Sequence, residues 1–353
     1  MAAVLASAPP VQSDMPGMPG MDSLPPPGFS HWWNAAPNAF FVTFIVVLAL
    51  LYVSAMVRLY RRGDRWPVLR TVCFAIGLVL LSWTTCSSMA QYGMALFSTH
   101  MLQHMMLSLV VPIFLLLGAP LTLTLRALHP APAGHTGPRE LLLSLLHSRF
   151  ARVVSSPLFT LPLFIASLYG LYFTSLFDVL MRSTVGHDLM LVHFLLVGTL
   201  FFWPVIGIDP APHRSPYVIR ILELFAAMPF HAFFGVAVMM SSSLITTTFA
   251  HPPAAWGVDP IADQGTAGAL AWAFGELPTV IVLLVLFLQW SKSDEREARR
   301  TDRKADRDGD SDLADYNAYL AGLAARGGQV AEQPRVPSES RVVATDGPVT
   351  PTA

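Results

Sequence analysis

Long apolar runs separated by short polar breaks dominate the chain. A membrane-spanning helix needs about 20 mostly apolar residues to cross the hydrocarbon layer. Seven runs of roughly this length occur, at Ala39 to Val57, Thr71 to Gln91, Met94 to Leu121, Pro157 to Phe177, His187 to Ile206, Ile221 to Leu244 and Gly268 to Trp290. The pattern predicts an all-α fold, a polytopic membrane helical bundle with seven transmembrane helices. Pro112 predicts a kink in the third of them because proline removes a backbone hydrogen bond.

The regions on either side of the apolar core have a different character. Residues 1–38 are rich in Pro, Gly and Met and predict a flexible segment, whereas residues 39–290 form the predicted transmembrane domain. Residues 291–326 are charged, with Leu and Tyr at helical spacing, and predict a helical tail. Residues 327–353 predict a disordered C-terminus.

The overall composition supports a membrane protein. Hydrophobic residues make up 53% of the chain and charged residues only 13%, against about 25% charged in an average soluble domain. The net charge is -1, from 22 Lys and Arg against 23 Asp and Glu, and it gives no indication of nucleic-acid binding. Cys73 and Cys86 would lie about 20 Å apart along one helix, so they are not expected to form a disulfide.

The positions of Lys and Arg predict how the bundle is oriented, because these residues are retained on the cytoplasmic side of a membrane. The N-terminal segment and the second and sixth connections contain no Lys or Arg, and the fourth contains only Arg182. The other connections and the tail are rich in them, and the N-terminus is therefore predicted outside and the C-terminus inside the cytoplasm. No basic residue precedes Arg58, so the first run lacks the charged start of a signal peptide.

Two histidines in the third run have the spacing of metal ligands. His100 and His104 are four residues apart, which places them on one face of a helix. Met101 and Met105 add thioethers beside them, and soft sulfur together with imidazole favours Cu(I) over hard cations. Met101 stands where a zinc protease would carry its catalytic glutamate, so the sequence does not support hydrolysis by that mechanism.

Other ionisable groups fall at comparable depths in other predicted spans. His193 lies in the fifth, with His187 at its mouth, and His231 lies in the sixth. Glu276 is the only carboxylate predicted to lie deep in any span, and Cys86 approaches the same outer half of the bundle from the second span. Ionisable groups in hydrocarbon are costly and commonly functional. This pattern favours a shared metal or proton site, and the alternative for each residue alone is an interhelical hydrogen bond.

A methionine motif precedes the first span. Met15, Met18 and Met21 are three residues apart in a flexible segment outside the membrane. Thioethers at this spacing can bind Cu(I), and a low-complexity linker is the alternative interpretation. We expect this motif to be accessory to the intramembrane residues.

Four sequence motifs resemble the CtaG-type (Caa3_CtaG) cytochrome c oxidase assembly proteins of bacterial membranes, in a form typical of actinobacteria. They are HMLQHMMLSLVVPIFLLLGAPLTL (100–123), HFLLVGTLFFWPVIGIDPAPHR (193–214), PFHAFFGVAVM (229–239) and AWAFGELP (271–278). The resemblance implies a multi-pass protein of the bacterial cytoplasmic membrane that helps haem-copper oxidase to mature, with copper delivery as its proposed role. It also implies that the family's histidine positions fall on His100, His104, His193 and His231.

The sequence leaves two alternative functions open. A b-type haem electron carrier would pair His100 or His104 with His193 on a facing helix, and a copper permease would need ligands through the cytoplasmic half, which the sequence lacks. No catalytic nucleophile, phosphate-binding loop or redox cysteine pair is present. We therefore expect a binding and assembly protein rather than an enzyme, with haem-copper oxidase subunits or other copper-delivery proteins as partners in the lipid bilayer.

Overall fold

The computed structural model of the chain describes residues 24–28, 30–132, 134–212, 215–308 and 311–331. Their regular structure is helical, with no strand and one isolated β-bridge between Ala35 and Ser87. The chain divides into two compact units, Met1–Trp290 and Ser291–Ala353. The all-α prediction is confirmed for the described residues.

The α-helices of the first unit follow one another along the chain with short connections. A π-helix at Met106–Val110 continues directly from α4 into α5. The α-helices are α1 (Ala39–Arg61), α2 (Val68–Cys86), α3 (Ser88–Tyr92), α4 (Phe97–Met105), α5 (Val111–Leu117), α6 (Pro120–Ala127), α7 (Pro138–Leu146), α8 (Arg149–Val154), α9 (Pro157–Tyr172), α10 (Leu176–Met181), α11 (Thr184–Ile206) and α12 (Tyr217–Met240). The last, α13 (Pro260–Asp308), begins in this unit and ends in the second.

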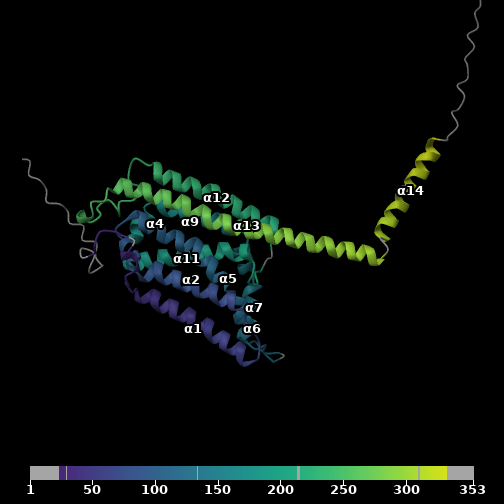
Figure 1. Ribbon diagram of the computed structural model, residues 1–353, viewed down its shortest axis with the longest axis horizontal. Coiled ribbons are helices and arrows are strands. Elements are labelled where there is room, and N and C mark those ends of the chain that lie inside the picture. The colour runs from purple at the N-terminus through teal and green to yellow at the C-terminus, as the bar shows by residue number, and fades with distance from the viewer. Residues whose placement is uncertain (1–23, 29, 133, 213–214, 309–310, 332–353) are drawn as a thin grey trace, which may run out of the picture. The chain divides into compact units, whose positions relative to one another are not determined.

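Helices α1, α2, α9, α11, α12 and α13 lie side by side in the first unit (Figure 1). Six helical segments are long and apolar enough to cross a membrane. Helix α9 is apolar but shorter than these six. Its 16 residues rise about 24 Å, which is less than the roughly 30 Å of a hydrocarbon core. The predicted fourth span, Pro157 to Phe177, is therefore interrupted, and the predicted count of seven is not confirmed.

Helix α9 nevertheless has hydrogen bonds near both of its ends. In its first turn the Thr160 hydroxyl donates to Glu223 Oε1 at 2.6 Å, near the start of α12. At its last residue the Tyr172 hydroxyl lies 2.5 Å from His104 Nδ1 on α4. Between these points α9 packs against α11 and α12.

One end of the bundle, which we call the Asn38 end, is where α1, α4, α11 and α13 begin. The Asn38 side chain accepts from the backbone N–H groups of Phe40 and Phe41 and donates to Asp188 on α11. Asp263 on α13 accepts hydrogen bonds from the N–H groups of Phe97 and Ser98 at the start of α4. These first N–H groups have no partner within their own helix, so the carboxylate of Asp263 caps α4 from another helix.

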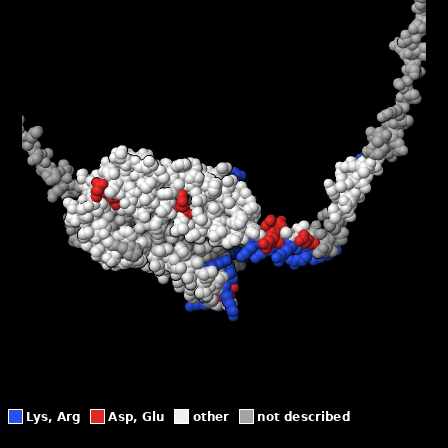
Figure 2. Space-filling model, turned by 45° about the horizontal axis from the view of Figure 1, so that its top comes forward, with Lys and Arg blue, Asp and Glu red and all other residues white. Residues whose placement is uncertain are grey.

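The opposite end, which we call the basic end, carries most of the Lys and Arg of this unit. Figure 2 shows basic side chains gathered there, whereas the rest of the visible bundle surface is nearly uncharged. The apolar side chains over the middle of the helices are exposed, as Leu50 and Leu51 illustrate with more than 60% of their surface accessible. Apolar surface of this kind, bounded by a charged end, is typical of a protein embedded in lipid.

The π-helix is the main irregularity inside the bundle, and it directly follows the two histidines of α4. Pro112 has no N–H to donate to the preceding turn, and the turn before it widens. At this point α11 comes so close that a Cβ added to Gly198 would lie 2.1 Å from the carbonyl oxygen of Ser108. Such π-helical turns occur frequently at functional sites.

The second unit consists of the rest of α13 and of α14 (Ser311–Ala331). The predicted amphipathic residues lie on α14 and are exposed: Leu313, Tyr316, Leu320 and Leu323. Helix α14 extends past the predicted start of the disordered terminus at residue 327.

Candidate metal centre

Three histidine side chains lie together near the Asn38 end, and we call His100, His104 and His187 the histidine triad. His100 and His104 are fully buried on α4, and His187 is buried on the first turn of α11. The ring centroids of His100 and His104 are 4.2 Å apart, and those of His100 and His187 are 5.5 Å apart. The spacing of four residues brings the first pair together, as predicted, and packing of α11 adds the third member.

Each member of the histidine triad has a buried Nε2 atom without a hydrogen-bond partner. His100 Nδ1 lies 2.9 Å from the carbonyl oxygen of Gly93. A carbonyl oxygen only accepts, so in the neutral ring Nδ1 carries the proton and Nε2 keeps a free lone pair. Buried polar atoms are almost always hydrogen-bonded, and three orphaned imidazole nitrogens in one place therefore indicate a binding site.

The second member of the histidine triad is held by an aromatic residue of α9. The Tyr172 hydroxyl can accept the proton of His104 Nδ1, which would leave the Nε2 lone pair of His104 free as well. On its other side the His104 ring packs against Phe194, at 4.0 Å between centroids. Hydrogen-bonded partners of this kind fix the tautomer and orientation of metal-binding histidines.

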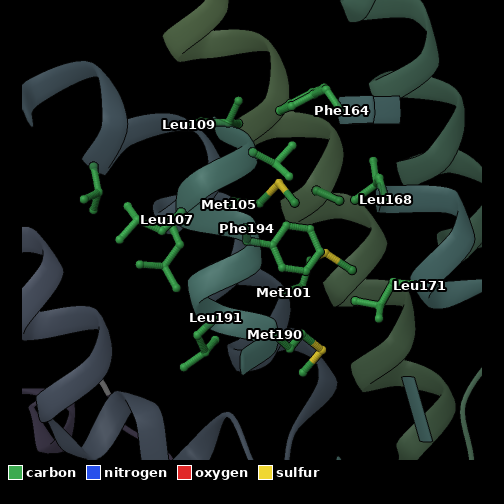
Figure 3. Packing of buried hydrophobic residues seen from close by; sticks show 14 of the residues in the cluster. Met101, Met105, Leu107, Leu109, Phe164, Leu168, Leu171, Met190, Leu191 and Phe194 are labelled. Carbon is green, nitrogen blue, oxygen red and sulfur yellow. The ribbon is translucent and has the colours of Figure 1, made fainter. Parts of the chain in front are cut away.

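His231 is buried on α12 beside a methionine of α4. Its Nε2 lies 3.1 Å from the sulfur of Met105, and Gly275 on α13 lies so close that an added Cβ would come 2.3 Å from the imidazole. The Nε2 atom of His231 is thus already paired with a thioether. Figure 3 shows Met101 and Met105 among apolar side chains that include Phe194 and Leu168.

Two predicted site residues lie apart from the histidine triad. His193 is exposed on α11 and its Nε2 is 2.9 Å from the hydroxyl of Ser167. Glu276 is partly exposed on α13, where its Oε1 accepts from the indole N–H of Trp272 on the same helix. The structure therefore brings together His100, His104 and His187, and it does not bring His193 or Glu276 into the same cluster.

The family to which the chain belongs follows from a comparison of its sequence with family models. Residues 50–293, more than half of the chain, match the model described as cytochrome c oxidase caa3 assembly factor (Caa3_CtaG). The chain belongs to this assembly factor family. The match includes every histidine and carboxylate described above, so these side chains lie in the region that the family shares.

Three mycobacterial proteins are similar to this chain over 281 residues at 47% identity. They are the uncharacterized proteins ML1998 of Mycobacterium leprae, Mb0105 of Mycobacterium bovis and MT0111 of Mycobacterium tuberculosis. The matched region covers 79% of this chain but only 42–43% of these relatives. No solved structure matches.

The remaining predicted ligands differ in how deeply they are buried. Met101 and Met105 are fully buried on α4. Cys86 is a free, partly buried thiol at the end of α2, where its carbonyl accepts from the N–H of Ala36. Met15, Met18 and Met21 lie outside the described residues.

Sequence reasoning missed two residues that the structure places at important points. Tyr172 lies in the apolar sequence YGLYF, where nothing distinguishes it from its neighbours. Its position near the end of the fourth run, at the predicted depth of His104, was the one available signal. Glu223 lies only two positions after the predicted start of the sixth span, yet it is buried and its Oε2 has no partner. Glu223 is therefore more deeply buried than Glu276. It was missed because it stands at the start of the predicted span, where a carboxylate is expected to reach water.

Among the described residues, no group of three or more His, Cys, Asp or Glu side chains already converges on a point that could hold a metal ion. The rings of the histidine triad are adjacent, but their Nε2 atoms are not arranged as a finished coordination sphere. A ligand bound there would require small rotations of rings that are already packed together.

Proposed function

We propose that this assembly factor binds Cu(I) with the histidine triad and passes it to a cytochrome c oxidase during maturation. The observation that carries the proposal is the set of three buried Nε2 atoms without partners on His100, His104 and His187. Family membership supports a role in oxidase assembly, and the histidine triad supports binding of Cu(I).

The nature of the triad fits a monovalent, soft ion. Neutral imidazole brings no charge into the apolar interior, and Cu(I) accepts low coordination numbers, so two or three nitrogens suffice. Three neutral imidazoles would leave the charge of a divalent cation unbalanced in hydrocarbon, and the carboxylates Glu223, which accepts from Thr160, and Glu276, which accepts from Trp272, are not part of the triad. Met101 and Met105, both buried on the same helix, offer the soft sulfur that copper prefers.

We propose that the role is binding and transfer without catalysis. Among the described residues, the hydrogen bonds and ring contacts of the triad with other residues come from the Gly93 carbonyl, the Tyr172 hydroxyl and the rings of Phe177, Phe194 and Phe249, and none of these is a serine, a cysteine or a carboxylate. The partners would be subunits of a haem-copper oxidase or other copper-delivery proteins in the bacterial cytoplasmic membrane. The N-terminal methionines would then serve as an accessory site that collects the ion.

Cu(I) binding to the purified full chain in detergent tests this proposal, with a chromogenic Cu(I) chelator as the competitor. We expect the parent to retain copper, and His100→Ala and His104→Ala to lose it while remaining folded by circular dichroism. His147→Ala is the matched control, because His147 is an exposed histidine at the end of α7 bonded to the Leu143 carbonyl. Copper retention equal to that of the parent in both triad variants would overturn the proposal.

A visible absorption spectrum of the same preparation separates the haem alternative from the copper proposal. A Soret band that copurifies with the parent and disappears in His104→Ala would favour a b-type haem carrier. In cells that carry His100→Ala, we expect the protein to accumulate while the oxidase remains immature. Mature oxidase in those cells would show that the triad is not needed for assembly.

We propose that α9 completes a seventh crossing, with the N-terminus outside and the C-terminus in the cytoplasm. Its hydrogen bonds near opposite ends of the bundle, to Glu223 and to His104, support this despite its length. A reporter inserted between α6 and α7 should be active only in the cytoplasm, and one inserted after Thr174 only outside. If both reporters were active on the same side of the membrane, α9 would not cross it. The bundle would then have six crossings, and every later loop would lie on the opposite side from the one inferred.

A further inference from the structure

Two neighbouring hollows lie at the basic end of the bundle, and arginines line both. The first has a volume of about 530 Å³ and includes Arg62, Arg126 and Arg139 in its lining. The second has a volume of about 360 Å³ and includes Arg58, Arg61 and Arg62. Arg62 and Leu128 line both hollows, which are therefore adjacent.

The shared arginine is held in place by the protein. One Arg62 nitrogen donates to the carbonyl of Arg126 at 3.2 Å, and the other lies 2.5 Å from Nδ1 of His129. These bonds connect the end of α1 to the end of α6. A guanidinium has five N–H donors, so donors of Arg62 remain for a ligand in either hollow.

The positive charge around the hollows is poorly balanced. No carboxylate is among the described residues that line them. Asp64 is bonded to Arg126 in the single ion pair of the described residues, at 2.6 Å. Glu140 is next to Arg139 and offsets part of its charge; its carboxylate accepts from the N–H groups of Ala131 and Gly137, and these bonds, that of Ala131 first, lower its pKa and keep it ionised.

Retention of basic residues on the cytoplasmic side explains why arginines occur in these loops. It does not explain why five of them surround two adjacent hollows. Arginine binds phosphate with paired, charge-assisted hydrogen bonds, and basic pockets beside membrane helices are typical sites for anionic lipid headgroups. Exposed apolar residues on α1 next to the hollows, among them Val53 and Val57, provide a surface for acyl chains.

We propose that the two hollows bind the headgroup of an anionic phospholipid that carries two phosphates, such as cardiolipin. One phosphate would occupy each hollow, and Arg62 would lie between them. The site is at the opposite end of the bundle from the histidine triad and does not depend on the copper proposal.

The test is lipid binding to the purified full chain in detergent, measured by native mass spectrometry. Cardiolipin is the main probe, phosphatidylglycerol is the lipid with one phosphate, and pyrophosphate is the diphosphate without acyl chains. We expect cardiolipin to bind more tightly than phosphatidylglycerol, and pyrophosphate to compete weakly. Competition by pyrophosphate as strong as that by cardiolipin would mean a soluble anion site and would overturn the lipid assignment.

Single substitutions can test each hollow separately. Arg139→Gln changes only the first hollow and Arg61→Gln only the second. Each should weaken cardiolipin binding about fivefold and remove most of its advantage over phosphatidylglycerol. Arg152→Gln removes the same charge from α8, away from both linings, and should leave the preference unchanged. Equal losses in all three variants would show a nonspecific charge effect and contradict the proposal, and unchanged thermal unfolding without lipid would confirm that the variants fold.

Discussion

A carboxylate and two imidazoles lie near the start of α4, and they differ in how many of their polar atoms are hydrogen-bonded. The carboxylate of Asp263 accepts hydrogen bonds from Phe97, Ser98 and the Ser98 hydroxyl, so its acceptors are in use. Within the next two turns of α4, His100 and His104 each leave one ring nitrogen without a partner. Burial alone therefore does not mark a site in this bundle.

The same contrast holds at the other end of the molecule. Asp209, between α11 and α12, accepts from Leu121 and Thr122 at the start of α6. Burial raises the pKa of this carboxyl, and the hydrogen bonds from Thr122 act in the opposite direction. Asp209 and Asp263 satisfy helix starts, whereas the Nε2 atoms of the histidine triad have no hydrogen-bond partner among the described residues.

The largest expected effect separates two histidines of the same helix. His187→Ala removes a member of the triad and should weaken Cu(I) binding by more than about 100-fold, beyond the range typical of an outer partner. His193→Ala removes an exposed ring bonded to Ser167 and should change the affinity by less than about twofold. Chelator competition measures both. A larger loss in His193→Ala would favour the wider ligand set that the family resemblance implies.

A smaller effect is expected from the residue that orients His104. Tyr172→Phe removes the hydroxyl bonded to His104 Nδ1, and loss of such a partner typically lowers metal affinity about tenfold or more. Tyr169→Phe is the matched control, because its hydroxyl, on the same helix, bonds the carbonyl of Phe230 on α12 instead of a histidine. The two variants should differ in copper affinity and not in thermal stability. Similar affinities in both would indicate that Tyr172 has only a structural role.

Asp263 should affect stability and leave copper binding intact. Asp263→Ala removes the cap of α4, and loss of a cap costs about 1–2 kcal/mol in the free energy of unfolding. Thermal unfolding in detergent should occur at a lower temperature than in the parent. Thr266→Ala on the same helix removes only a bond to the Ala262 carbonyl and should have little effect. A loss of copper affinity in folded Asp263→Ala would mean that capping and binding are coupled.

Most of the fold could be predicted from the apolar pattern, because every long run became helical, although the second and third runs each contain more than one helix. The fourth run is divided as well: α9 ends at Tyr172, and Thr174 and Ser175 separate it from α10 although the apolar run continues. The proline in the third run predicted a kink, and the structure has a π-helical turn directly before it, which Gly198 of α11 approaches closely. Contacts between helices decide such details, and the pattern of one run contains no information about them.

The candidate site was only partly predictable for a similar reason. A spacing of four residues placed His100 and His104 together without any knowledge of neighbouring helices. His187 and His193 are six residues apart and point about 120° apart on a helix, so the two need not share a site, and the sequence favoured His193 as the ligand. The rotation of α11 decides which of them faces α4, and that rotation is set by packing. Helix α11 also begins at Thr184, earlier than predicted, so His187 lies within its first turn and is buried there.

The smallest effect is expected for Glu276, and the reason lies in its neighbour on α13. Gly275 faces His231, since an added Cβ would meet the imidazole, so the next residue is turned about 100° away around the helix. Glu276 accordingly bonds Trp272, whose ring is 44% exposed on the outer surface. Glu276→Gln keeps this acceptor, so copper affinity should stay within about twofold of the parent value. Gly275→Ala provides the contrast, because it forces the His231 ring and Met105 to move. A large loss of copper in Glu276→Gln, measured by the same chelator competition, would show that the carboxylate reaches the metal and that the site extends beyond the histidine triad.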